Sequence, residues 1–581
     1  MSTAAKEAYK LGQNDRFLKK TFGRYLIPTM VGTLGGTINV LVDGIIVGQK
    51  IGSDGLAAVS ICMPVYLLLC TVGSLLVSGG CVCSSREIGS GDMKKAVRIF
   101  NSVTLYAAAV SIIITVIGGL LAAPAAAVLS GGGSLYEMVY DYSLVTLLGS
   151  AAKIMVYIPI YYLRLDGKSK QSSVCALIMT AANAALDLLL IFGLDMGITG
   201  AALASVIASA SACAVGFVFL AKSDNFRFRL EFEKPRLLLS VVKFGSPAAM
   251  DNLMSALRVL FLNSALLSFG GNIMVSVFSV VNSLSEFALF AVNGIPQTAA
   301  PIIGIYSAER NKGGLAIMLR QELRAAAISV ISYGALISVF SAQIGVLFGV
   351  DCPVTGAVVC LAAGLAFGSL NNILAGYYSS SGHVAIANTI TVSRIFVCTV
   401  ITLTALIRLG GYVWLFLPLT EIMTLLLTLG ILAVQRAKNR SRTFFLLNDK
   451  GSDEHVLDFS VSSSSEEICS ASEKISDFCG ENDMSPAQTM KISLAIEEIL
   501  TIMTQKCFGD GKEHTFDLRA FSTAASTGIR IRCLGRKFNP MTLLETDENG
   551  DESMGVKIIA AMAKSVDYQC VFGANSLMII I

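Results

Sequence analysis

The feature that most constrains this chain is a series of twelve apolar stretches between residues 25 and 436. Each stretch is long enough to cross a bilayer as a helix, which takes about 20 apolar residues. The stretches lie at 25–48, 56–82, 99–122, 138–163, 172–194, 198–221, 240–268, 273–300, 325–349, 355–380, 385–408 and 411–435. They predict an α-helical, multi-pass membrane protein with twelve transmembrane helices.

Composition and charge divide the chain into two parts. Charged residues make up 15% of the 581 residues, whereas soluble proteins carry about 25%. Residues 1–436 hold 29 basic and 20 acidic side chains, a net charge of +9, and residues 437–581 hold 15 and 21, a net charge of −6. We therefore expect a membrane part and a separate acidic tail. The tail is not expected to bind nucleic acid, because such binding requires clustered positive charge.

Lysine and arginine are distributed unevenly over the connections between the stretches. They gather after the second, fourth, sixth and eighth stretches, whereas the alternate connections hold little beyond Lys50 and Arg408. Basic connections stay in the cytoplasm, so both termini are expected on the cytoplasmic side of the inner membrane. The expected segments are a cytoplasmic N-terminal segment (1–24), an N-lobe of six spans (25–222), an interlobe linker (223–239), a C-lobe of six spans (240–436), a linker (437–454) and a cytoplasmic domain (455–581).

The two sets of six stretches echo each other. Segment 161–167, with two adjacent tyrosines and a glycine, recurs as segment 377–382. Six spans followed by six of the same orientation form a parallel repeat, and transporters place their substrate between such repeats. A channel more often assembles several chains around one pore, so the repeat favours a transporter.

Three asparagine–acid pairs lie inside the stretches. They are Asn39 with Asp43, Asn183 with Asp187, and Asn282 with Glu286. Residues four apart share one face of a helix, and an ionisable group inside the membrane marks a candidate functional site. A carboxyl group in hydrocarbon favours its neutral form, and a neighbouring amide can bond to either form. Such a pair can exchange a proton for a cation, which is what an ion-coupled exporter requires.

Basic residues at similar depth leave a structural alternative open, because buried charges are usually paired. The alternative pairs are Lys153 with Asp43 or Asp187, Arg258 with Asp251 or Glu286, and Arg394 with Glu421. Arginine cannot lose its proton, so a carboxylate paired with it should stay ionised and carry protons poorly. A buried lysine can lose its proton, so an acid beside Lys153 can still titrate.

Short motifs spread over many stretches carry a family resemblance. They are Val42-Asp43-Gly44, Leu56-Ala57-Ala58-Val59, Gly89-Ser90-Gly91-Asp92, Leu163-Arg164-Leu165-Asp166-Gly167, and Asn183 with Asp187. Through them residues 20–436 resemble the multidrug and toxic compound extrusion (MATE) family. The resemblance implies an antiporter of two six-helix lobes that exports amphipathic organic cations in exchange for protons or sodium ions.

The resemblance also implies roles for particular residues. The positions that take the coupling ion in the N-lobe of many members are occupied here by Asp43, Asn183 and Asp187. Ser205 falls where the sixth helix often has a hydroxyl group. A second pattern in some members needs an acid in the tenth helix, where this chain has Asn371 and Asn372. The resemblance therefore implies an ion site in the N-lobe rather than a sodium site in the C-lobe.

The tail beyond residue 454 alternates between strand and helix patterns. Strands are expected at 455–461, 515–521 and 528–533 and after residue 565, and helices at 465–479, 486–507 and 556–565. About 130 residues are enough for a separate hydrophobic core. The expected fold is a C-terminal α/β two-layer sandwich.

Three motifs in the tail resemble the GHKL ATP-binding fold, and anti-sigma-factor serine kinases in particular. They are Leu494-Ala495-Ile496-Glu497-Glu498-Ile499-Leu500-Thr501, Phe538-Asn539-Pro540 and Met554-Gly555-Val556-Lys557. The resemblance implies that Glu498 stands where a glutamate positions water. The asparagine that holds magnesium in that family is replaced here by Ile502, the aspartate that reads adenine is replaced by Cys533, and Ser553 replaces a glycine of the phosphate loop.

The replaced positions argue against a working nucleotide site in the tail. Magnesium requires oxygen ligands, and the apolar side chain of Ile502 offers none. ATP with magnesium is therefore not expected as a cofactor, and the tail is expected to be a pseudo-ATPase or pseudokinase that regulates the transporter or binds a partner. The 14 cysteines lack the C-x-x-C spacing of a zinc site, so no bound metal is expected either.

Three functions stay open from the sequence, and none of them is enzymatic. The first is export of organic cations or drugs in exchange for H⁺ or Na⁺. The second is flipping or export of a lipid-linked or anionic envelope precursor, suggested by Lys153, Arg258 and Arg394. The third is a membrane-anchored regulator that acts through the tail. Further cavity candidates are Ser205, Asp251, Asn282 and Glu286, and the expected partners are the bilayer, a small amphipathic substrate and a cytoplasmic protein.

Overall fold

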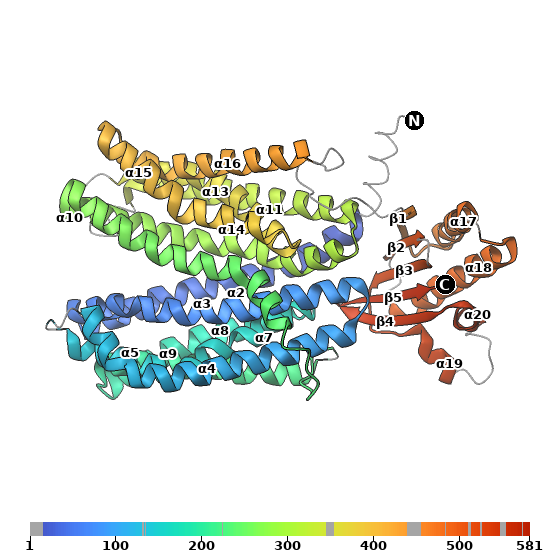
Figure 1. Ribbon diagram of the computed structural model, residues 1–581, viewed down its shortest axis with the longest axis horizontal. Helices are drawn as coiled ribbons and strands as arrows, with labels where there is room; N and C mark the ends of the chain where they lie inside the picture. Colours follow the sequence, from blue (N-terminus) through green and yellow to red (C-terminus); the bar gives the residue numbers. More distant parts are fainter. Residues whose placement is uncertain are drawn as a thin grey trace.

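The computed structural model describes residues 15–130, 133, 135–223, 225–343, 354–438, 455–482, 484–508, 513–522, 526–546, 554–571 and 573–581. They form a long helical membrane part and a small domain with a β-sheet, which we call the tail domain, at one end of it (Figure 1). We call the helix ends nearest to the tail domain the tail-side ends.

The helices between residues 15 and 221 form the N-lobe. They are α2 (Asp15–Lys50), α3 (Ser53–Ser90), α4 (Met93–Ser130), α5 (Tyr136–Leu148), α6 (Ser150–Met155), α7 (Tyr157–Leu165), α8 (Ser169–Asp187) with a π-helical continuation (Leu188–Gly193), and α9 (Gly197–Ala221). Helix α8 packs against both α2 and α9. The expected first and fifth spans are therefore direct neighbours.

The helices between residues 237 and 438 form the C-lobe. They are α10 (Leu237–Ala308), α11 (Lys312–Val339), α13 (Thr355–Ser380), α14 (Val384–Val392) with a π-helical continuation (Ser393–Val397) into α15 (Cys398–Leu409), a short 3₁₀ turn (Val413–Leu415), and α16 (Phe416–Lys438). Helix α13 packs against α10, α11 and α16.

Helix α10 contains both the seventh and the eighth expected spans. Its 72 residues would extend about 108 Å if straight, about twice the length of α3. Both of its ends nevertheless lie against α3: a methyl group at Gly79 would meet the Val241 carbonyl, and one at Gly89 would meet Ile305. The backbone of α10 must therefore turn back on itself, and its two arms are the two expected spans.

The number of spans agrees only in part with the sequence. Ten helices among the described residues are long and apolar enough to cross a membrane, or eleven when one bent pair counts as a span. Twelve therefore stays a prediction, and several side chains of the first expected span lie outside the described residues. The expected helix 138–163 is bent by 56° between α5 and α6. The bend falls at Gly149-Ser150, and such pairs are a common cause of kinks.

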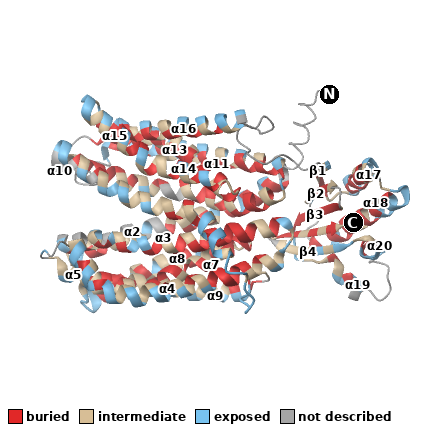
Figure 2. Cartoon of the chain, viewed as in Figure 1, coloured by how far each residue is buried: buried red, intermediate tan, exposed pale blue. Residues whose placement is uncertain are grey.

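The outer surface of the membrane part is apolar. Helix α4 exposes Ile112, Val116 and Leu120, which lie four residues apart and so share one face. Buried residues concentrate between the helices, while many outward positions are exposed (Figure 2). An exposed face of this kind is stable against lipid rather than water, which agrees with a multi-pass membrane protein.

The tail domain is built on a five-stranded antiparallel sheet of order β1-β2-β3-β5-β4. The strands are β1 (His455–Ser462), β2 (Thr515–Ser522), β3 (Thr527–Leu534), β4 (Ser565–Val571) and β5 (Ala574–Ile580). The longer helices are α17 (Ser465–Glu481), α18 (Pro486–Cys507) and α20 (Met554–Met562). These elements match the expected ones closely. Helix α20 ends before the expected residue 565, because β4 begins there.

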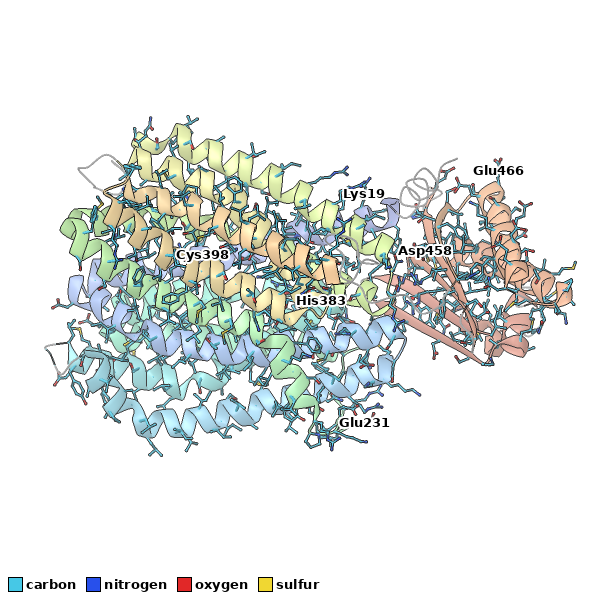
Figure 3. The ribbon with its side chains drawn as sticks, turned by 45° about the horizontal axis from the view of Figure 1, so that its top comes forward. Lys19, Glu231, His383, Cys398, Asp458 and Glu466 are labelled. Carbon is cyan, nitrogen blue, oxygen red and sulfur yellow. The ribbon has the colours of Figure 1, made fainter. Side chains whose placement is uncertain are left out.

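The two faces of the sheet differ because alternate side chains of a strand point to opposite sides. Phe459, Leu518 and Ile531 belong to the apolar face, which shares one hydrophobic core with α17, α18 and α20. The opposite face carries charged side chains, among them Asp458, which lies on the side of the tail domain towards the membrane part (Figure 3). The charged face is therefore the one that meets the membrane part (Figure 1).

Candidate functional site

The predicted ion-coupling residues come together inside the N-lobe, where α2 and α8 pack against each other. Asp43 is half-buried, while Asn183 and Asp187 are buried, and the two carboxyl groups interact electrostatically. Among the described residues, one oxygen of Asp43, both oxygens of Asp187 and the Asn183 amide nitrogen have no hydrogen-bond partner. Buried polar atoms are normally bonded, so the chemistry of this cluster suits a proton or a small cation.

The backbone around this cluster is irregular. Asp187 is the last residue of α8, and the π-helical turn Leu188–Gly193 follows directly. Turns of this type are rare and occur often at functional sites. Asn39 lies in α2 one turn before Asp43, but its side chain lies outside the described residues.

Lys153 has a different partner from the one the structural alternative required. Its Nζ donates to Ser205 Oγ at 2.6 Å and lies 5.3 Å from the ring centre of Tyr66. The ion pairs within 4 Å that the described residues form do not include Lys153 with Asp43 or with Asp187. Helix α6, which carries Lys153, packs against α9, which carries Ser205. Two predicted cavity residues thus meet each other, while Lys153 and Asp43 still interact electrostatically.

A larger cavity of about 350 Å³ lies between the two lobes. Its polar lining comes from α3, α7, α10, α13 and α14 and includes Ser74, Ser78, Tyr157, Tyr161, Arg164, Asp251, Asn252, Asn293, Gln297, Asn372 and Ser379. Two hydrogen bonds join the lobes beside it, from Arg164 Nη1 to Gln297 Oε1 at 2.5 Å and from Asn252 Nδ2 to Ser74 Oγ at 3.1 Å. Of the predicted residues, Asp251 lines this cavity, while Asp43 and Asp187 lie apart from it.

The C-lobe holds a second group of charges around a cavity of about 100 Å³, lined by Arg258, Arg394 and Glu421 among others. Arg394 Nε lies 3.9 Å from Glu421 Oε1, which confirms the expected pair, and Asn371 donates to the same carboxylate at 2.8 Å. Arg258 shares this cavity, whereas Asp251 lines the central one. Asn282 and Glu286 lie in the second arm of α10.

Sequence reasoning missed two functional candidates. Glu322 of α11 is completely buried, and within the described residues neither of its oxygens has a hydrogen-bond partner. It was overlooked because it stands between Arg320 and Arg324 and looks like part of a basic connection. Arg164 was noted only as part of a motif, although its position beside the paired tyrosines was a usable signal for the cavity.

Two helical lobes with a polar cavity between them, and a separate pair of acids inside the N-lobe, define a multi-pass membrane transporter. The MatE family model matches residues 28–189. The multidrug export protein MepA of Staphylococcus aureus (strain COL) is 24% identical over 405 residues, which cover 68% of this chain and 89% of that protein. MepA of Staphylococcus haemolyticus is 25% identical over 297 residues, or 50% of this chain and 65% of that protein.

Solved structures extend the comparison. An outward-facing multidrug resistance MATE family transporter gives a TM-score of 0.67 at 22% identity, over 73% of this chain and 97% of that chain. The MATE multidrug transporter DinF-BH gives a TM-score of 0.65 at 26% identity, over 74% of this chain and 97% of that chain. A transporter of the MOP superfamily from Pyrococcus furiosus gives a TM-score of 0.68 at 20% identity, over 73% of this chain and 97% of that chain. Its binding pocket is described as having reverse polarity. The membrane part therefore has the MATE fold, and together the matches support a MATE family transporter. MATE homologues are secondary transporters and not enzymes.

Two of the tail positions that the resemblance assigns to a nucleotide site are occupied by core side chains. Ile502 and Cys533 are buried in the hydrophobic core of the tail domain. A methyl group at Gly555 would lie 2.9 Å from Glu498 Cβ, so α18 and α20 pack closely where Glu498 stands. Asn539 caps a short turn through the Met541 amide. The described residues at these positions therefore serve packing and capping.

We predict that the full-length protein does not bind ATP with magnesium. Calorimetric titration at millimolar nucleotide should give the heat of dilution alone, because no oxygen ligand stands at position 502. The variant Ile502→Asn introduces the amide oxygen that the resembled family has at this position, and the same titration of this variant is the comparison. Saturable heat from the unchanged protein would contradict the prediction.

Proposed function

We propose that this protein is a secondary active multidrug exporter that exchanges amphipathic organic cations for H⁺ or Na⁺, with Asp43, Asn183 and Asp187 as the coupling site. The observation that carries the proposal is the group of buried, unbonded polar atoms between α2 and α8. Uptake of a positive ion there satisfies the unbonded carboxylate oxygens and removes the repulsion between the two carboxylates. The names of the MepA proteins agree with this activity.

The central cavity suits the proposed substrate. Tyr157 and Tyr161 supply aromatic faces, and Asp251 supplies a negative charge. An organic cation is attracted to both types of group. Because Asp43 and Asp187 lie apart from this cavity, ion and substrate would act on each other through a movement of the lobes rather than by contact, as in alternating access.

The tail domain completes the proposal as a regulatory, non-catalytic part. The distribution of basic connections supports a cytoplasmic location for both termini, and the tail domain would then lie on the cytoplasmic side. A protein partner for it remains part of the proposal.

A second candidate is a flippase for a lipid-linked or anionic envelope precursor. The observation that favours it is Arg164, a cationic side chain at the wall of the central cavity. Arg258 and Arg394 line the neighbouring cavity of the C-lobe. The fold relative with a pocket of reverse polarity is one example of such a change in charge.

Reconstituted protein distinguishes the two candidates. We predict that proteoliposomes containing a pH-sensitive and a sodium-sensitive dye show proton or sodium movement when a cationic amphipathic substrate is added on one side. Empty liposomes serve as the control. Ion movement that occurs only with a polyprenyl phosphate would favour the flippase, and no response to either guest would contradict both.

A further inference from the structure

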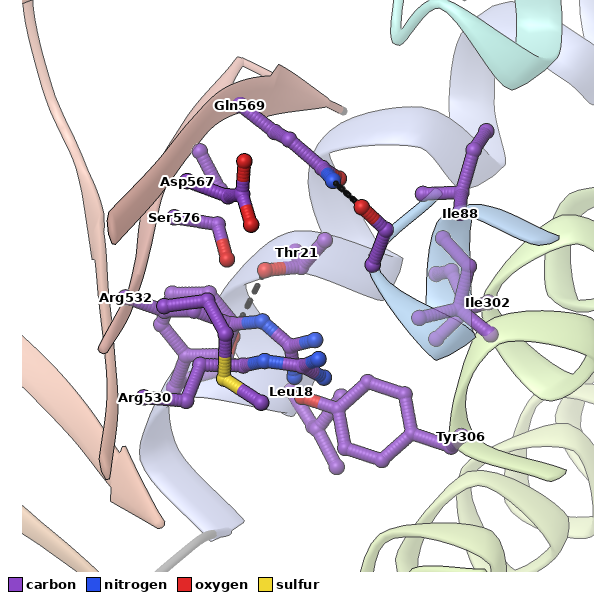
Figure 4. Close-up of a pocket in the computed structure, with 15 residues that line it drawn as sticks. Leu18, Thr21, Ile88, Ile302, Tyr306, Arg530, Arg532, Asp567, Gln569 and Ser576 are labelled. Carbon is purple, nitrogen blue, oxygen red and sulfur yellow. Dashed lines mark hydrogen bonds between the residues drawn. The ribbon is translucent and has the colours of Figure 1, made fainter. Parts of the chain in front are cut away.

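The charged face of the tail sheet contacts the tail-side ends of both lobes. Neighbouring strands place Arg519 opposite Arg530, and Asp517 opposite Arg532. The two β3 arginines extend from the sheet towards Tyr306 of α10 (Figure 4). All three arginines are buried, so this face is an interface and not a solvent-exposed surface.

On the C-lobe side, the interface is organised around Glu309, the residue that follows α10. Arg530 Nη1 lies 2.5 Å from Glu309 Oε1, and Arg532 bonds to both oxygens of the same carboxylate. Arg519 Nη2 donates to the Glu309 carbonyl at 2.8 Å. Burial alone would raise the pKa of Glu309, but the neighbouring arginines hold this pKa below its ordinary value. The carboxylate therefore stays ionised, and the ion pairs persist near neutral pH.

On the N-lobe side, the same sheet bonds to the end of α3 and to the linker before α10. Arg530 Nη2 donates to the Gly89 carbonyl at 3.2 Å, and Gln569 Nε2 donates to the Gly91 carbonyl at 2.9 Å. Asn225 Nδ2 donates to the Cys570 carbonyl at 2.6 Å. The guanidinium group of Arg530 thus joins Gly89 of the N-lobe to Glu309 of the C-lobe.

The two lobes are themselves in close contact at this end. A methyl group at Gly89 would lie 2.4 Å from the Ile305 carbonyl, and one at Gly304 would lie 2.2 Å from Ser85 Oγ. Helices α3 and α10 both end here, and the carbonyl end of a helix attracts positive charge. The arginines are accordingly bonded to helix ends and to Glu309. These partners compensate their buried positive charges, so no separate anionic ligand is needed.

We propose that the tail domain acts as an intramolecular clamp, which holds the tail-side ends of the two lobes together and restrains the alternation of the transporter. The restraint on transport rests on the proposed function, whereas the contact between the tail domain and the two lobes does not. Lobes that rock about a central site must separate at this end in one half of the cycle. They cannot do so while Arg530 bonds to both.

The interface is suited to opening and closing. Beside the ion pairs and single hydrogen bonds, Leu534 and Ala574 of the tail domain join the hydrophobic cluster of the membrane part. The interface also contains cavities of about 50 Å³ and 290 Å³, whereas permanent interfaces are packed as tightly as protein interiors. A signal that binds the charged face of the sheet, or masks Glu309, would release the lobes.

Hydrogen–deuterium exchange of the full chain in lipid nanodiscs tests the clamp. In the double variant Arg530→Ala/Arg532→Ala, backbone amides of residues 86–91 and 303–311 should exchange faster, by roughly 5–150-fold. The control is Lys491→Ala/Lys557→Ala, which removes two exposed positive charges from α18 and α20 and should change nothing at these sites. Unchanged exchange in the arginine variant would overturn the proposal.

A variant outside the tail domain guards against misfolding of the sheet. Glu309→Gln keeps the shape of the side chain but removes its charge, and it should raise the same exchange rates while β2 and β3 stay protected. Transport should also become faster in this variant. If no variant transports and the exchange still rises, the proposed function fails and the clamp stands. If transport is normal and exchange is unchanged, the clamp fails alone.

Discussion

Replacing Asp43 by asparagine should reduce substrate-driven proton or sodium movement in proteoliposomes to the level of empty liposomes. An amide has nearly the same shape as a carboxyl group, but it cannot take up a proton and offers no negative charge to a cation. In the wild type, Asp43 and Asp187 interact directly, so neutralising one removes both the ion ligand and the repulsion that ion binding relieves. Asp187→Asn should have the same effect for the same reason.

The control for this experiment lies in the same lobe. Asp141 of α5 is exposed, and Asp141→Asn should transport like the wild type. Ion movement that survives in both Asp43→Asn and Asp187→Asn would contradict the coupling site. Glu322→Gln would then become the next variant to measure, because Glu322 is the other buried acid with unbonded oxygens noted above.

The second large effect is expected from Gly79→Ala. The added methyl group would lie 1.9 Å from the Val241 carbonyl oxygen, and a methyl group at the neighbouring Gly245 would lie 1.8 Å from the Leu75 carbonyl. These contacts are with backbone atoms, which cannot rotate away, so α3 and α10 must separate. Overpacking of this kind costs about 1–3 kcal/mol, equivalent to a shift of roughly 5–150-fold against the state with closed tail-side ends.

A matched glycine is available for comparison. Gly430 of α16 has no atom within 4 Å of an added methyl group, so Gly430→Ala should be neutral or stabilising by about 0.5–1 kcal/mol. The measurements are transport rate and thermal unfolding of the purified proteins. Equal transport by Gly79→Ala and Gly430→Ala would show that close contact of the lobes at this level is not required.

The sequence was informative about individual segments. The apolar stretches and the strands of the tail follow from patterns within about 10–30 residues, because burial in lipid or in a protein core acts on each segment separately. The expected pair of Arg394 with Glu421 was also found. The expected span 138–163 is bent by 56°, since a single Gly-Ser step allows a bend that hydropathy does not register.

The sequence was least informative about partners. It suggested Lys153 as an ion-pair partner for the acids, whereas Lys153 donates a hydrogen bond to Ser205 and interacts with Asp43 without an ion pair within 4 Å. It treated the tail as a separate body, although Arg530 and Arg532 alternate with isoleucines along β3 and thereby form a charged face. That alternation was a readable signal for an interface, but nothing in it identified Glu309 as the partner.

The sequence by itself determined that residues 25–436 enter a membrane, that the chain is repeated in two lobes, and that a folded acidic tail follows. These properties depend on local length, hydropathy and charge. Only the tertiary structure decided which polar groups remain unbonded in the N-lobe and where the tail is attached. Such contacts join residues more than 140 positions apart, as Asp43 and Asp187 are, or more than 400, as Gly89 and Arg530 are. They depend on how the helices pack, which no local pattern specifies.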